Sequence, residues 1–92
     1  MFKTKDFGLA ALLVANNIKL TNYTTDELGQ MWFEFLDDAT TRELEHSFNL
    51  ATAMVNVQKF TAASKMLKAL IYQNRKNIYE HKLGKLNYNT IR

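Results

Sequence analysis

Apolar and polar residues alternate with two different periods along this chain, and the change of period separates predicted helices from predicted strands. The first segment has helical spacing, with apolar residues at Phe7, Leu9, Ala10, Ala11, Leu12, Leu13 and Val14. Thr4 is expected to cap this helix, with Asp6 in its first turn, where the helix dipole favours an anion. Asn16 and Asn17 are expected to end it, since asparagine tolerates a left-handed conformation.

Two segments with a period of two come next and predict a β-hairpin. The first is residues 18–24, and the second places Met31, Phe33 and Phe35 in alternation with Trp32, Glu34 and Leu36. The sequence Thr-Asp-Glu-Leu-Gly at residues 25–29 is typical of a hairpin turn. We expect the set that begins with Met31 to face the core and the set that begins with Trp32 to lie on the opposite face.

Two further helices are predicted after the hairpin. Asp37 or Asp38 caps a helix that runs to about Ala51, with Leu44 and Phe48 pointing inward. Residues 52–55 form a connection, and Asn56 caps the last helix. Its apolar stripe is the clearest periodicity in the chain: Phe60, Ala63, Leu67, Leu70 and Ile71.

The order of elements predicts one α+β domain over residues 1–92, with the arrangement α-β-β-α-α. Because a two-stranded hairpin is marginal alone, the helices are expected to cover one of its faces. Nothing stops the last helix before Gly84, so it is expected to continue through Ile78. Residues 74–92 are then a helix extension and a tail.

Composition narrows the range of chemistries. The chain has no cysteine, which excludes disulfides, thiolate metal sites and cysteine nucleophiles. The absence of cysteine also weakly indicates an intracellular, cytoplasmic protein, located in the host cytoplasm if a phage encodes it. The longest apolar run, residues 9–15, is too short to span a membrane, and its flanks do not make a signal peptide. No membrane partner is therefore expected.

The net charge of +3 conceals a division along the chain. Residues 1–56 carry four Lys or Arg against eight Asp or Glu, whereas residues 57–92 carry eight Lys or Arg against one Glu. This asymmetry indicates an anionic partner for the C-terminal part. The alternatives are that the acidic half faces the basic helix, or that the charges are solvated separately.

The pattern resembles an uncharacterised family of small bacterial, archaeal and phage domains, one of the domains of unknown function. The matching residues are Thr4-Lys5-Asp6, Leu9 to Leu13, Trp32 to Phe35 with Asp37-Asp38, Leu44, Phe48, Val55, Lys59-Phe60 and Leu67 to Tyr72, within residues 3–73. Asn17 departs from the pattern, where a glycine would be expected. The resemblance implies a fold and an origin in a phage or mobile element, and implies no activity.

Signals of catalysis are poor, so a non-enzymatic protein without a cofactor is expected. Glu43 and His46 have the Glu-x-x-His spacing of a di-metal carboxylate motif, but the chain has no second copy of it, so no metal site is predicted. Asp37 and Asp38 are read as a helix cap rather than as catalytic carboxylates. The glycines are isolated and form no phosphate-cradling loop.

The last helix carries the strongest functional pattern. Within about 100° of its circumference, away from the apolar stripe, lie Lys65, Lys68, Tyr72, Arg75, Lys76 and Tyr79. Lysine and arginine neutralise phosphates, and tyrosine rings stack on exposed bases. We therefore expect this face to bind nucleic acid or a nucleoprotein complex. The competing interpretation is a solvated helix face with lysines that confer solubility.

A protein partner is the second hypothesis. Tyr23, Trp32 and Leu36 could form an aromatic patch on the open face of the hairpin, and aromatic side chains are favoured anchors at interfaces. An inhibitor of a host protein, a virion component and a homodimer would each fit that patch. The alternative is that another segment covers these residues.

Overall fold

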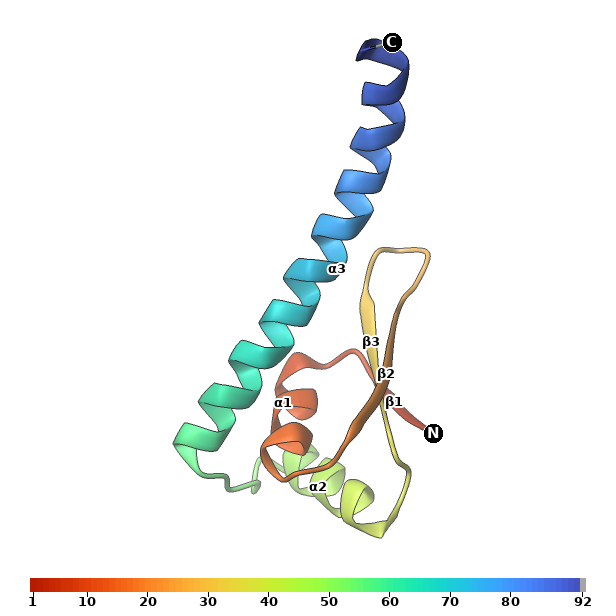
Figure 1. Ribbon diagram of the computed structural model, residues 1–92. Helices are drawn as coiled ribbons and strands as arrows, with labels where there is room; N and C mark the ends of the chain where they lie inside the picture. Colours follow the sequence, from red (N-terminus) through yellow and green to blue (C-terminus); the bar gives the residue numbers. More distant parts are fainter. Residues whose placement is uncertain (92) are drawn as a thin grey trace.

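In the computed structural model, the backbone of residues 1–91 and the side chains of residues 1–76 are described. The elements are β1 (Phe2–Thr4), α1 (Phe7–Ala15), β2 (Leu20–Thr25), β3 (Met31–Phe35), α2 (Ala39–Asn49) and α3 (Val57–Ile91). The α+β class is therefore confirmed, with one strand more than predicted. Figure 1 shows α1 between the sheet and α3, and α2 at the end of the molecule opposite the hairpin turn.

The sheet has three antiparallel strands in the order β1-β3-β2. The hairpin predicted from sequence is β2–β3, and β1 pairs with the edge of β3 that faces away from β2. In β1, Phe2 pairs with Phe35 and Thr4 with Phe33. Phe33 and Phe35 are buried, and Met31 is half-buried against the same core, so the prediction that these three face inward is confirmed. Residues paired across antiparallel strands share a face, so β1 places Phe2 in this core as well.

The prediction that Thr4 caps the first helix is wrong, because Thr4 belongs to β1. Its hydroxyl instead accepts a hydrogen bond of 3.1 Å from the backbone N–H of Asp6. The carboxylate of Asp6 accepts from the N–H of Leu9 at 3.1 Å and is the N-cap of α1. At the other end Asn16 is the C-cap and Asn17 has a φ of 65°, which confirms the predicted left-handed turn.

Helix α1 is the centre of the core, because six of its nine residues are buried and the other three are half-buried. Figure 1 shows it enclosed by the sheet, α2 and α3, which explains why its sequence is apolar on all sides. The packing is close: a Cβ at Gly8 would lie 3.1 Å from the ring of Phe48 in α2. A side chain at Gly8 would therefore push α2 away.

The two later helices begin as predicted, at side-chain caps. The carboxylate of Asp38 accepts from the N–H of Thr41 at 2.9 Å, and the side chain of Asn56 accepts from the N–H of Lys59 at 3.0 Å. Helix α2 ends at Asn49, two residues before the predicted end, and the chain reverses at Ala51, whose φ is 59°. These caps satisfy N–H groups that have no partner within the helix.

Helix α3 packs on α1 through its predicted stripe. Ala63 and Leu67 are buried, while Phe60, Leu70 and Ile71 are half-buried against the core. The helix then continues to Ile91 as one element of 35 residues, so the segment predicted as an extension and a tail is helical as far as Ile91. At 1.5 Å per residue its length is about 52 Å, which accounts for the longest dimension of the molecule, 56 Å.

We predict that Phe35→Ala lowers the free energy of unfolding by about 3–5 kcal/mol, because Phe35 is fully buried and truncation leaves a cavity. Leu28→Ala is the control, since Leu28 is 85% exposed and should change stability by less than about 0.5 kcal/mol. Chemical denaturation measures both values. Equal effects of the two substitutions would contradict the assigned core.

Candidate nucleic-acid interface

The basic face of α3, which we define as Lys65, Lys68, Tyr72, Arg75 and Lys76, is exposed along its described length. Tyr72 has 69% of its surface exposed, so its ring is accessible to a planar partner. The backbone of α3 is one continuous helix through these positions, and their spacing therefore keeps them on one side of it. The side chain of Tyr79, the last residue of the predicted set, lies outside the described residues.

No acidic side chain interrupts α3 between Val57 and Tyr79. The salt bridges of the acidic half are local: within residues 1–76 they join Arg42 to Asp37 at 2.8 Å and to Glu45 at 3.3 Å. The hydrogen bond from Arg42 lowers the pKa of Asp37. In this part of the chain no salt bridge reaches Lys65, Lys68 or Arg75. The acidic half therefore does not neutralise these three cations by direct pairing.

Two residues of the basic face lie close to other elements. The ammonium of Lys68 is 6.0 Å from the centre of the Phe7 ring at the start of α1, within the range of a cation–π contact. Arg75 lies beside the hairpin turn and helps to line a pocket there. The basic face thus runs from α1 to the turn between β2 and β3.

The hairpin turn is organised by Asp26. Its carboxylate accepts from the backbone N–H groups of Leu28 and Gln30, each at 2.9 Å, and from the indole N–H of Trp32 at 2.8 Å. Gly29 has a φ of 81°, a conformation that suits glycine and lets the chain reverse here. The turn is therefore fixed by both backbone conformation and side-chain hydrogen bonds.

Lys5 connects the start of α1 to this turn. Its ammonium donates to Oε1 of Gln30 at 3.1 Å and lies 5.7 Å from the centre of the Trp32 ring. On the other side, the amide nitrogen of Asn74 in α3 donates to Oγ1 of Thr25 at 2.7 Å. Segments from three parts of the chain are thereby held together around the turn.

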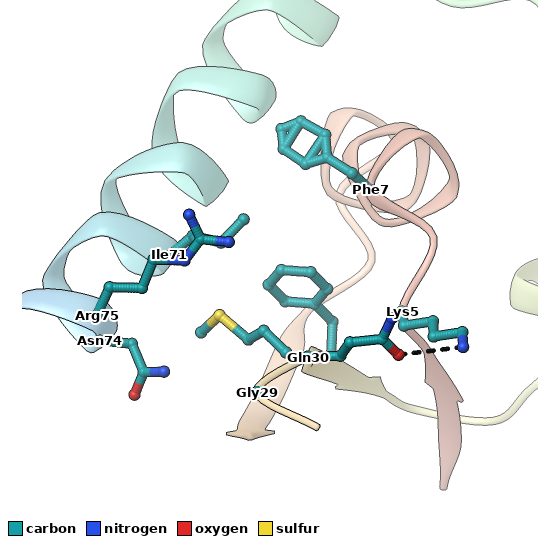
Figure 2. A pocket seen from close by; sticks show the side chains of 9 residues that line it. Lys5, Phe7, Gly29, Gln30, Ile71, Asn74 and Arg75 are labelled. Atoms are coloured by element: carbon teal, nitrogen blue, oxygen red, sulfur yellow. Dashed lines mark hydrogen bonds between the residues drawn. The ribbon is translucent and has the colours of Figure 1, made fainter. Parts of the chain in front are cut away.

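A pocket of about 220 Å³ lies between these segments, and Figure 2 shows it from close by. Its lining comprises Lys5, Phe7, Gly29, Gln30, Met31, Phe33, Ile71, Asn74 and Arg75. Sequence reasoning missed it because its walls come from the start of α1, the turn and α3. The sequence predicts Arg75 as a surface cation, and no local pattern indicates that Lys5 lies on the opposite wall.

The predicted aromatic patch is not assembled. Tyr23 pairs with Phe33, so its side chain is on the face of the sheet that carries the helices, whereas Trp32 pairs with Thr24 and lies on the other face. Leu36 follows the end of β3, about 13 Å along the chain from Trp32. Tyr23 and Leu36 are 40% and 56% exposed, but the three residues do not form one surface.

The residues considered for metal binding and catalysis have other surroundings. Asp38 caps α2, while Glu43 and His46 are exposed on that helix. Among the described residues, no group of three or more His, Asp or Glu side chains could hold a metal ion. The expectation of a non-enzymatic protein stays a prediction.

Searches against family models, curated proteins and solved structures found no match to this chain. The resemblance to a family of unknown function therefore stays a prediction. Within the described part of the chain, none of the helices combines the length and apolarity needed to cross a membrane.

We predict that the fluorescence of Trp32 reports the ionisation of Asp26. The hydrogen bond from Trp32 is the largest cause that lowers the pKa of Asp26, followed by the backbone N–H of Gln30, and Leu28 and Lys5 act in the same direction. Because the pKa of Asp26 is lower in the folded protein, its ionised form stabilises the turn at any pH above the pKa of the unfolded chain, about 3.9. This stabilisation is lost as the pH falls through the pKa of the folded protein. Trp32 is the one tryptophan of the chain, so its emission should change with a midpoint below about 3.9.

Two asparagine variants test this assignment. Asp26→Asn should abolish the acid transition in emission, because the amide does not titrate. Asp37→Asn, at the other carboxylate with a lowered pKa, should leave the transition in place. A wild-type midpoint at or above the ordinary aspartate value would contradict the hydrogen-bonded turn.

Proposed function

We propose that this protein is a non-enzymatic accessory protein that binds nucleic acid, or a complex containing it, through the basic face of α3. The observation that carries the proposal is an exposed row of cations and Tyr72 on a helix without acidic residues up to Tyr79. Cations at this spacing can follow a phosphate backbone, and the tyrosine can stack on a base. An origin in a phage or mobile element rests on the family resemblance alone.

The geometry of α3 supports this proposal in a second way. The helix is anchored by the stripe from Phe60 to Ile71, on the side that faces α1. Changes on the basic face therefore leave the apolar anchor in place, so binding and folding can be tested separately. The length of α3 lets a strand contact several turns of one helix.

We predict that affinity for short single strands falls steeply with salt. Contact with about four phosphates gives a slope of log affinity against log salt near −3 for single strands, because bound cations release counterions. Replacing Lys68 and Arg75 with glutamine should reduce the magnitude of this slope by about one unit per lost contact. Tyr72→Ala should instead weaken binding by about 1–3 kcal/mol through lost stacking, with little change in slope. Fluorescence anisotropy at several salt concentrations measures both effects.

Lys59→Gln is the matched control, because Lys59 lies on α3 away from the basic face and lines a separate groove with Met66. It removes the same charge from the same helix and should leave the slope nearly unchanged. Equal effects of Lys59→Gln and Lys68→Gln would show that net charge, rather than this face, determines binding. Absence of binding up to about 100 µM would overturn the proposal, since typical non-specific affinities are tighter. A protein partner would then be the better hypothesis.

A further inference from the structure

The pocket beside the hairpin turn has an apolar floor and a polar rim. Phe7, Met31, Phe33 and Ile71 form the floor, whereas Lys5, Gln30, Asn74 and Arg75 provide the polar groups. We propose that this pocket receives one unstacked base of a single-stranded nucleic acid, with the phosphates on either side of that base near Lys5 and Arg75. The inference deepens the proposed function and rests on it.

The volume of the pocket fits one base. A cavity of about 150 Å³ in a protein core holds benzene, and this pocket is larger, at about 220 Å³. One heterocycle fits, whereas the sugar and phosphate stay outside, at the rim. A base within a duplex would first have to leave its stack, which costs a few kcal/mol. The pocket therefore favours unpaired strands.

The floor offers the surface that a base requires. Phe33 is almost fully buried and fixes the bottom of the pocket. Phe7, Met31 and Ile71 are half-buried, so each retains accessible apolar surface. Aromatic and apolar side chains bind the faces of bases, and such stacking tolerates any base sequence.

The two amides on the rim are held by hydrogen bonds to their neighbours. Asn74 uses its amide nitrogen to donate to Thr25, which leaves its carbonyl oxygen as an acceptor. Gln30 uses its carbonyl oxygen to accept from Lys5, which leaves its amide nitrogen as a donor. The remaining acceptor of Asn74 and the remaining donor of Gln30 match the edge of a base, which carries both kinds of group.

The charges favour a nucleotide within a strand over a free nucleotide. Figure 2 shows Lys5 and Arg75 on opposite sides of the pocket. A nucleotide in a strand has a phosphate on each side, and a free monophosphate has only one. Arg75 has no salt-bridge partner within residues 1–76, and it joins this pocket to Lys68 and Tyr72 on the basic face. One strand could therefore follow α3 and place a base in the pocket.

The direct test is NMR of the full chain with labelled methionine and isoleucine methyl groups, using hexathymidylate and thymidine monophosphate as probes. Bound hexathymidylate should give nuclear Overhauser effects from its base protons to the methyl groups of Met31 and Ile71. Met54 and Met66 are internal controls, because they are 90% and 41% exposed and lie outside the pocket lining. They should show no such effects. Stacking on Tyr72 alone would not produce signals at Met31.

Two lysine variants complete the test by anisotropy. Lys5→Gln should reduce the magnitude of the salt slope for hexathymidylate by about one unit. Lys3→Gln should leave it unchanged, because Lys3 lies opposite Glu34 in the strand register and therefore on the outer face of the sheet. Hexathymidylate could bind with the predicted dependence of affinity on salt but give no nuclear Overhauser effects at Met31 or Ile71. That result would overturn the base pocket and leave the proposed function standing. Binding of the monophosphate alone would overturn the strand assignment, and binding of neither probe would overturn both proposals.

Discussion

The structure depends on the need to enclose helix α1 on all sides. Its nine residues, Phe7–Ala15, include no polar side chain, and a helix this short is unstable alone in water. Its stability must come from packing, which the sheet, α2 and α3 provide from different directions. Gly8 allows the ring of Phe48 to approach closely, and the Asp6 cap fixes where the helix begins.

This enclosure determines which surface of α3 stays accessible. Burial of α1 requires only one stripe of α3, with Ala63 and Leu67 at its centre. The cations beside that stripe, Lys65, Lys68, Arg75 and Lys76, therefore remain exposed. The same packing carries α3 past the hairpin turn, where Asn74 bonds to Thr25. Further along α3, at Ile71, Asn74 and Arg75, the helix and the turn leave a pocket between them. The fold and the candidate site therefore share one physical origin.

Much of this arrangement could be predicted from local sequence. Periodicity predicts α1, the β2–β3 hairpin and the stripe of α3, and capping chemistry predicts Asp38 and Asn56. Strand β1 could not be predicted, because three residues carry no period of their own and Phe2 is buried only through its pairing with Phe35. Local sequence therefore predicts Thr4 as a helix cap, although its backbone belongs to the sheet.

The candidate site, like the fold, can be predicted only in part from local sequence. Helical spacing alone predicts that Lys65, Lys68, Tyr72 and Arg75 lie on one face of α3. Strand pairing places Tyr23 opposite Phe33 and therefore on the other face of the sheet from Trp32. The predicted grouping of Tyr23 with Trp32 is wrong for this reason. The pocket depends on Lys5 and Arg75, which are brought together only by tertiary packing. The periodicity of apolar residues thus predicts the surface of a single helix or strand. A site between elements can be predicted only when the pairing register of the strands and the packing of the helices are known.

The most direct measurement is a map of backbone amide shifts during titration with hexathymidylate at low salt. If the basic face and the hairpin turn bind the strand, shifts should concentrate at residues 65–76 and 26–31. Residues 39–49 of α2 carry acidic side chains and should remain unshifted. Shifts concentrated on α2 would contradict the assignment of the binding surface, and so would saturation of binding without any shift on α3.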